Sequence, residues 1–310
     1  MGNLVLPSGN VMHYSGTEFG HMIRVIDSGK AGPNLLVTGA VHGDEVCGPK
    51  AIFPMLEEFK SGLLKIDSGT VTFVPVCNLE AYAANTRYIK ENMNRVWYPF
   101  ADPQSIDHEQ VQALLPIFEN KTHYLDLHSV HTPSPAFVFN DQETPESRAM
   151  AMILGADYIV EGWAKLYPPT NPNETIPEEP DTLWYAKSKG VTGCLIECGD
   201  HTQPEAVAVA RRAILNTFNH LGMMDTGLII PQKPELLRMT DMVRRPISES
   251  FEFAEGVTNF ARMEKGQLIA RFSGVNNNEL RAPHDGYMLV PFPGAKVGEE
   301  MIYWARPEVV

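Results

Sequence analysis

The chain has 310 residues, enough for one large domain or for a large domain with a small companion. Apolar residues make up 44% and charged residues 20%, which is ordinary for a folded soluble protein, and no apolar run is long enough to span a membrane. The net charge of −13 argues against a nucleic-acid partner, because phosphate binding requires a basic face.

The N-terminus shows no basic region followed by an apolar stretch, so we expect no signal peptide. The four cysteines are scattered, and none forms a Cys-x-x-Cys pair. We therefore expect free thiols, most simply small buried side chains, in a cytoplasmic protein.

Up to about Gly222 the chain alternates short apolar runs with helical patterns. Residues 34–41 predict a strand, and residues 45–59 predict a helix with one apolar face. The alternation continues with predicted strands at 70–78, 123–129 and 192–199, and with predicted helices after Ser105, Thr144 and Asp181 and at 203–222. Such alternation is typical of the α/β class, in which a mostly parallel sheet carries helices on both faces.

The pattern changes after Gly222, where short strands and turn residues replace the long helices. We predict a small antiparallel β domain there, and divide the chain into residues 1–230 and residues 231–310. Residues 167–181 are polar, rich in proline and long for a loop of a compact domain. A lid over a binding site and a solvated connection are both compatible with that loop.

A histidine and a glutamate mark the junction between the first predicted strand and helix. His42 and Glu45 are three residues apart, and positions i and i+3 of a first helical turn project to the same side. Histidine nitrogen and glutamate oxygen both bind zinc at about 2.0–2.2 Å. A satisfied surface histidine beside a helix cap at Asp44 is the simpler alternative.

A third ligand is expected from a neighbouring strand end. His128 ends an apolar strand, and Asp126 lies two residues earlier on the same face, where it can orient a ligating imidazole. Two histidines, one glutamate and an open position form a known catalytic zinc arrangement. His131 competes as the third ligand, and a non-haem iron site has a similar donor set.

Two further segments carry candidate catalytic residues. The segment NTRYIKENMNRVW contains Arg87, Asn94 and Arg95, and arginine offers a planar fork of donors to a carboxylate or an oxyanion. Glu197 lies within an otherwise apolar strand, which suggests a general base with a raised pKa. A structural ion pair with an arginine is the alternative for that glutamate.

The motifs VHGDE, NTRYIKENMNR, LDLHS and IECG occur in this order. Together they resemble the succinylglutamate desuccinylase/aspartoacylase family, a branch of the zinc carboxypeptidase-like hydrolases. The resemblance covers roughly residues 35–222 and implies an α/β/α sandwich followed by a small, barrel-like β domain. It also implies a catalytic domain that binds one zinc ion per chain through His42, Glu45 and His128.

The resemblance implies roles for four more residues. Glu197 corresponds to the general base and acid, and Arg87 to the residue that polarises the scissile carbonyl. Asn94 and Arg95 correspond to the pair that holds a substrate carboxylate. Asn92 departs from the family pattern, in which an aspartate usually stands at this position.

A second departure concerns the carboxylate-binding arginine that aspartoacylase has upstream of its catalytic glutamate. The corresponding segment, DTLWYAKSKG, offers only Lys187 and Lys189. N-acetylaspartate and succinylglutamate are therefore poor candidates as substrates.

The function predicted from the sequence is zinc-dependent hydrolysis of the amide bond of a small N-acylated amino acid or amine. A zinc carboxypeptidase that acts on short peptides is the main alternative, and a non-catalytic binding protein on the same fold is a second. The predicted partner is the small-molecule substrate, without nucleic acid or membrane. The sequence does not specify the oligomeric state, and a homo-oligomer is one option.

Overall fold

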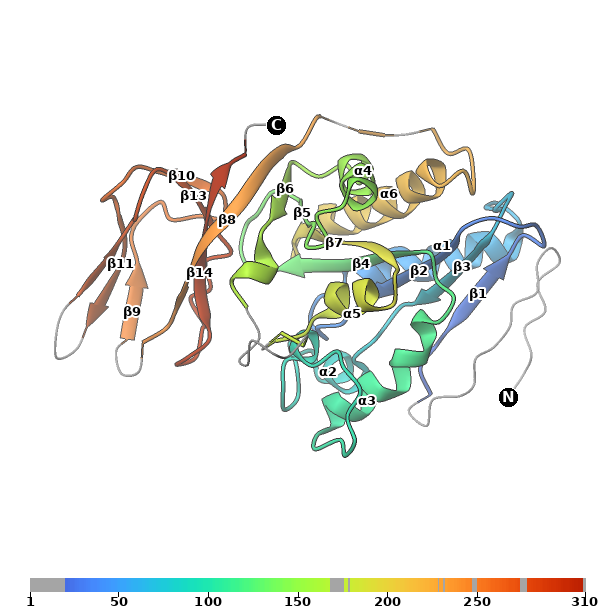
Figure 1. The fold of residues 1–310 in the computed structure, drawn as a ribbon, viewed down its shortest axis with the longest axis horizontal. Coiled ribbons are helices and arrows are strands. Elements are labelled where there is room, and N and C mark those ends of the chain that lie inside the picture. The colour runs from blue at the N-terminus through green and yellow to red at the C-terminus, as the bar shows by residue number, and fades with distance from the viewer. Residues whose placement is uncertain are drawn as a thin grey trace.

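A computed structural model describes residues 20–167, 176–177, 179–227, 229–230, 232–246, 250–273 and 278–308. One sheet of eleven strands runs through these described residues (Figure 1). Its strands, in order across the sheet, are β1 (Arg24–Asp27), β3 (Thr70–Val74), β2 (Asn34–Gly39), β4 (His123–Val130), β7 (Thr192–Asp200), β5 (Phe137–Phe139), β6 (Tyr158–Glu161), β8 (Glu235–Arg244), β14 (Glu300–Pro307), β13 (Gly286–Leu289) and β10 (Ala261–Met263).

The sheet is mixed, with a parallel centre. Strands β3, β2, β4 and β7 pair in parallel, whereas β1 and β5 pair antiparallel with β3 and β7. The predicted α/β class with a mostly parallel mixed sheet is thereby confirmed. The sequence analysis did not anticipate β1, β5 and β6, each of which has only three or four residues.

Helices cover both faces of the sheet. α1 (Cys47–Ser61), α4 (Pro145–Ile153) and α6 (Glu205–His220) enclose a core on one face that includes Phe59, Phe73 and Phe218. α3 (Ile106–Leu114) and α5 (Thr182–Ser188) enclose a second core on the other face, built around Trp97, Phe118 and Tyr124. In Figure 1, α4 and α6 lie above the sheet and α3 lies below it. A short helix, α2 (Leu79–Ala84), follows β3.

The predicted helix starts at Ser105, Thr144 and Asp181 are confirmed by their capping hydrogen bonds. Ser105 Oγ accepts from the His108 amide at 3.2 Å, and Thr144 forms a reciprocal capping box with Ser147. Asp181 Oδ1 accepts from the Trp184 amide at 2.7 Å. These caps fix where the chain leaves each preceding loop.

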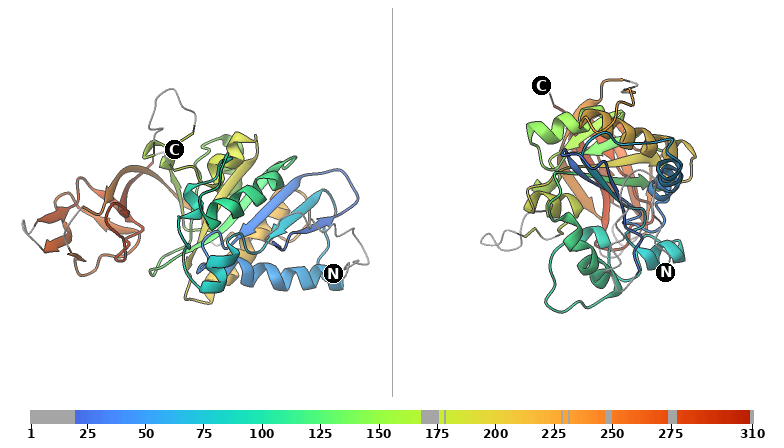
Figure 2. Two further views of the ribbon diagram at one scale, coloured as in Figure 1. Left: turned by 90° about the horizontal axis from the view of Figure 1, so that it is seen from below. Right: turned by 90° about the vertical axis from the view of Figure 1, so that its right-hand side faces the viewer.

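The C-terminal strands extend the main sheet and also form a second one. β8 pairs in parallel with β6 and antiparallel with β14, so the main sheet continues into the C-terminal part. A separate sheet of three strands consists of β9 (Ser250–Phe253), β11 (Leu268–Ser273) and β12 (Glu279–Arg281). Figure 1 and the left view of Figure 2 place these strands at one end of the molecule, away from α1 and α6. The predicted β-rich C-terminal part is confirmed, while the boundary at residues 230/231 stays a prediction, since Pro231 lies outside the described residues.

Within the described part of the chain, no helix combines the length and the apolar character that a membrane crossing requires.

Candidate active site

His42 and Glu45 lie in the turn between β2 and α1. The helix begins only at Cys47, so the prediction that both residues occupy its first turn was wrong. The turn is closed instead by a hydrogen bond from the Glu45 amide to the His42 carbonyl at 3.2 Å. A Cβ atom on Gly43 would lie 2.1 Å from the carbonyl carbon of Ala81, so the close packing of this turn against α2 requires glycine.

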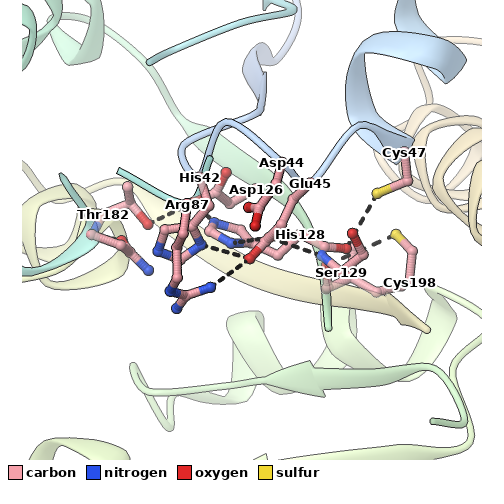
Figure 3. Close-up of polar contacts among 12 residues, drawn as sticks. His42, Asp44, Glu45, Cys47, Arg87, Asp126, His128, Ser129, Thr182 and Cys198 are labelled. Carbon is pink, nitrogen blue, oxygen red and sulfur yellow. Dashed lines mark hydrogen bonds and ion pairs between the residues drawn. The ribbon is translucent and has the colours of Figure 1, made fainter. Parts of the chain in front are cut away.

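The turn brings His42 and Glu45 to His128 at the end of β4. The ligand atoms of these three buried side chains all lie within 4.8 Å of one another. His42 Nδ1 lies 2.7 Å from Glu45 Oε1, and His128 Nδ1 lies 3.0 Å from Glu45 Oε2 (Figure 3). The cluster can therefore hold a metal ion through two imidazole nitrogens and one carboxylate.

A buried carboxylate orients His128 from behind. His128 Nε2 lies 3.0 Å from Asp126 Oδ2, as the sequence analysis expected. Asp126 in turn accepts hydrogen bonds from the hydroxyls of Thr38 at 2.6 Å and Thr182 at 2.7 Å. This arrangement leaves Nδ1 directed at Glu45, and a carboxylate that accepts from the far nitrogen is what metal-binding histidines ordinarily have.

His42 is oriented by Asn92, the residue that departs from the family pattern. His42 Nε2 lies 2.9 Å from Asn92 Oδ1, which also accepts from the Asn94 amide at 3.0 Å. Burial, followed by the charge of Arg87, lowers the pKa of His42 to about 3. The imidazole is therefore neutral, as a metal ligand must be.

His131 does not join the cluster. Its Nδ1 lies 4.0 Å from Asp44 Oδ2, and its Nε2 lies 3.5 Å from Arg87 Nη1. Its ring stacks on Phe292 with the centroids 5.1 Å apart. Geometry favours His128 over His131 as the third ligand.

Glu197 lies on β7 directly beside His128. The two residues are register partners in the parallel pairing of β4 with β7. Within the described residues, Glu197 Oε2 is buried without a hydrogen-bond partner. Burial, followed by the charge of Glu45, raises the pKa of Glu197 to about 8. An unengaged carboxyl group beside a metal-type cluster is suited to proton transfer.

Arg87 reaches the same cluster from the other side. Its Nη1 donates to Glu45 Oε1 at 2.8 Å, and its backbone carbonyl accepts from the Gly43 amide at 3.1 Å. The side chain remains 28% exposed and lines the adjoining cavity. Arg87 can thus present donors to a bound molecule.

Asn94 and Arg95 are engaged by the chain itself. Asn94 Oδ1 accepts from the Thr182 amide at 3.2 Å. Arg95 Nε forms an ion pair with Glu179 Oε2 at 2.7 Å, and its guanidinium lies 5.0 Å from the ring centroid of Trp163. A substrate carboxylate that used Arg95 would share it with Glu179.

The structure describes only part of the 167–181 loop, namely Tyr167, residues 176–177 and residues 179–181. The prediction that this loop is a lid or a solvated connection therefore lies outside the described residues.

A cavity of about 710 Å³ opens over these residues. Its wall includes His42 and Glu45 of the cluster, together with Glu197 and Arg87. The C-terminal part of the chain contributes Phe292, Lys296 and Tyr303 to the same wall. Its size suits a small organic molecule.

The catalytic-domain family described as Succinylglutamate desuccinylase/Aspartoacylase matches residues 31–220. The chain belongs to this family. The matched residues contain the whole cluster, Arg87 and Glu197. A family relative from Halomonas elongata, N-alpha-acetyl-L-2,4-diaminobutyric acid deacetylase, is 29% identical over 294 residues, which cover 86% of this chain and 79% of the relative.

Solved structures of the family share the fold over nearly the whole chain. The product-bound ectoine utilization protein EutE (DoeB) from Ruegeria pomeroyi has 22% identity and a TM-score of 0.71, covering 92% of this chain and 88% of its own. A succinylglutamate desuccinylase/aspartoacylase from Rhodobacter sphaeroides has 19% identity and a TM-score of 0.73, covering 93% and 89%. The C-terminal strands are therefore part of a shared architecture.

Proposed function

We propose that this chain is a zinc-dependent amidohydrolase that removes the acyl group from a small N-acylated amino acid or amine. The observation that carries the proposal is the convergence of His42, Glu45 and His128 beside the unengaged carboxyl of Glu197. The curated relative, by its name, deacetylates an N-acetylated diamino acid, which is a substrate of this class. The expected location is the cytoplasm.

The donor set suits zinc. Two imidazoles and one carboxylate leave a coordination position open, and the far nitrogen of each imidazole already has an acceptor. Zinc held there would polarise the scissile carbonyl and lower the pKa of water.

Two side chains of the protein, Glu197 and Arg87, then take part in the reaction. Glu197 takes a proton from the attacking water and delivers it to the departing amine nitrogen. A cation on Glu45 offsets the negative charge that helps to raise the pKa of Glu197, so that its carboxylate becomes available as a base. Arg87 donates to the oxygen of the scissile carbonyl as negative charge develops, an effect of about 3 kcal/mol for a single donor.

Asn94 and Arg95 complete the substrate-binding side of the proposal. Arg95 lines the cavity and is the guanidinium closest to Trp163. A substrate carboxylate would compete with Glu179 for the Arg95 guanidinium. The strength of the substrate contact therefore depends on how readily the ion pair between Arg95 and Glu179 opens.

Glu197→Gln tests the proposal most directly. The amide keeps the shape of the side chain and cannot accept the proton. The purified, zinc-loaded variant should retain its metal by elemental analysis and should lose about 100-fold or more of the activity found in a screen of N-acyl amino acids. Near-normal turnover with the metal in place would remove Glu197 from the mechanism, and a wild-type protein inactive on every N-acyl compound would remove the deacylase assignment.

A further inference from the structure

One acidic side chain in the wall of the cavity has no role in the proposed reaction. Asp141 follows β5 by two residues and lines the same cavity as Glu197 and Arg87. Its Oδ1 atom is buried, and no described residue donates a hydrogen bond to it. No lysine, arginine or histidine of the described residues forms an ion pair with it within 4.0 Å.

The surroundings of Asp141 add negative charge. Burial, followed by the charges of Asp181 and Glu143, raises the pKa of Asp141 well above its usual value. The charges of Lys187 on α5 and of Arg95 act in the opposite direction, but the Lys187 Nζ is directed at the Gln142 carbonyl at 3.5 Å. The chain thus holds a carboxyl group whose buried Oδ1 atom has no hydrogen-bond donor and which has no ion-pair partner among the described residues, so that a cationic ligand would stabilise it.

Two arginines of the cavity wall, Arg95 and Arg244, are held by other carboxylates. Arg95 is bound to Glu179, and Arg244 is bound to Glu179 and Glu300 at 3.2 and 3.5 Å. Both arginines are therefore engaged by carboxylates other than Asp141.

The sheet register gives the position of Asp141 relative to the reaction. β5 runs antiparallel to β7, with Phe137 opposite Glu197 and Phe139 opposite Leu195. Asp141 follows two residues after the end of β5, beyond the pairing of Phe139 with Leu195. Phe139 and Leu195 line the cavity between the two acids. A molecule extending from Glu197 to Asp141 would cross an apolar surface and end at a negative group.

We propose that Asp141 binds an ammonium group of the substrate, separated from the scissile amide by an aliphatic spacer. The substrate class is then an N-acylated diamine or diamino acid that keeps one free amine. Asp141 is a specificity-determining residue in this proposal, which rests on the proposed deacylase function.

The test compares substrates with cationic, neutral and anionic side chains on the zinc-loaded protein. Each substrate is named by the charge of its side chain, because all of them carry the α-carboxylate. The cationic substrates are Nα-acetyl-L-2,4-diaminobutyrate, Nα-acetyl-L-ornithine and Nα-acetyl-L-lysine, whose spacers increase in length. Nα-acetyl-L-norvaline and Nα-acetyl-L-norleucine are the neutral controls, and Nα-acetyl-L-aspartate is the anionic one. We expect at least one cationic substrate to exceed its neutral counterpart in kcat/KM by about 10- to 100-fold, as a charge-assisted hydrogen bond in a desolvated site allows.

Asp141→Asn is the decisive variant, and Glu91→Gln is its matched control. Glu91 lines the same cavity at an exposed position, so its substitution removes one negative charge from the cavity without touching the buried wall. Asp141→Asn should lose the preference for cations and keep its turnover of the neutral substrates, whereas Glu91→Gln should keep the preference. A wild-type protein that hydrolyses neutral or anionic substrates as well as cationic ones would overturn the inference and leave the deacylase function standing.

Two further measurements keep the outcome decisive. Removal of an unpaired buried charge should not lower the melting temperature, so a cooperative transition of Asp141→Asn at or above the wild-type value shows that the variant is folded. If no N-acyl compound is hydrolysed, calorimetric titration with L-ornithine and L-norvaline decides the inference alone. Tighter binding of L-ornithine that disappears in Asp141→Asn supports it, and equal binding or none overturns it.

Discussion

His128 and His131 are three residues apart in sequence, but their side chains have different surroundings. His128 is fixed between Glu45 and Asp126 at 3.0 Å from each, whereas His131 contacts Arg87 and stacks on Phe292. His128→Ala should therefore lose bound zinc, while His131→Ala should keep about one zinc per chain. Elemental analysis of both purified variants checks this, and an unchanged zinc content in His128→Ala would transfer the ligand role to His131.

At the residue scale, the sequence indicated the candidate site residues better than it indicated their hydrogen-bond and ion-pair partners. Spacing and strand ends indicated His42, Glu45 and His128, because the carboxyl ends of adjacent parallel strands meet at one edge, but they left His131 as a competitor for the third position. The hydrogen bond from His42 to Asn92 and the ion pair of Arg95 with Glu179 could not be anticipated. Each joins segments whose relative position only the folded chain defines.

Helices and strands were easier to predict from the sequence when they were long and when capping residues marked their ends. Strands β2, β4 and β7 and helix α6 have long periodic patterns, and the helix caps are local in sequence. The short β5 carries too few residues for a period to be recognised, and its antiparallel pairing with β7 depends on tertiary contacts. That pairing nevertheless places Asp141 in the cavity, so the specificity residue escaped the sequence analysis together with its strand.

Glu161 joins three elements at the junction between β6 and the C-terminal strands. Its buried side chain accepts from Arg148 Nη2 at 2.7 Å, from Arg238 Nη2 at 3.0 Å and from Asn140 Nδ2 at 2.7 Å. Glu161→Gln should lower the free energy of unfolding by about 2–3 kcal/mol, because hydrogen bonds to a buried charge are lost while both arginines remain.

Glu58→Gln is the control for that substitution. It breaks an ion pair with Arg211 of similar length, 2.7 Å, in which both side chains are partly exposed. Its cost should stay below about 1 kcal/mol. Chemical denaturation of the two variants compares them, and equal losses would show that Glu161 contributes no more than a surface pair.

At the scale of the whole molecule, the C-terminal part of the chain helps to enclose the cavity. Tyr88 Oη, from the segment that carries Arg87, donates to Glu299 Oε1 at 3.0 Å and accepts from Lys296 Nζ at 3.0 Å. Phe292 stacks on His131 and lines the cavity wall. These contacts join the C-terminal part of the chain to the segment of Arg87 and to His131 at the cavity wall.

The enclosure predicts steep selection by substrate size, which also separates the deacylase from the alternative carboxypeptidase. A peptidase needs an open groove for several residues, whereas a cavity of about 710 Å³ accommodates one small molecule. The zinc-loaded protein should release acetate or succinate from N-acyl amino acids and leave N-blocked tri- and tetrapeptides intact. Phe292→Ala, which shortens the wall without touching the metal cluster, should raise the turnover of the longer compounds relative to the short ones. Chromatography of the products measures both effects, and efficient release of C-terminal residues from tetrapeptides by the wild-type protein, without deacylation, would establish the carboxypeptidase instead.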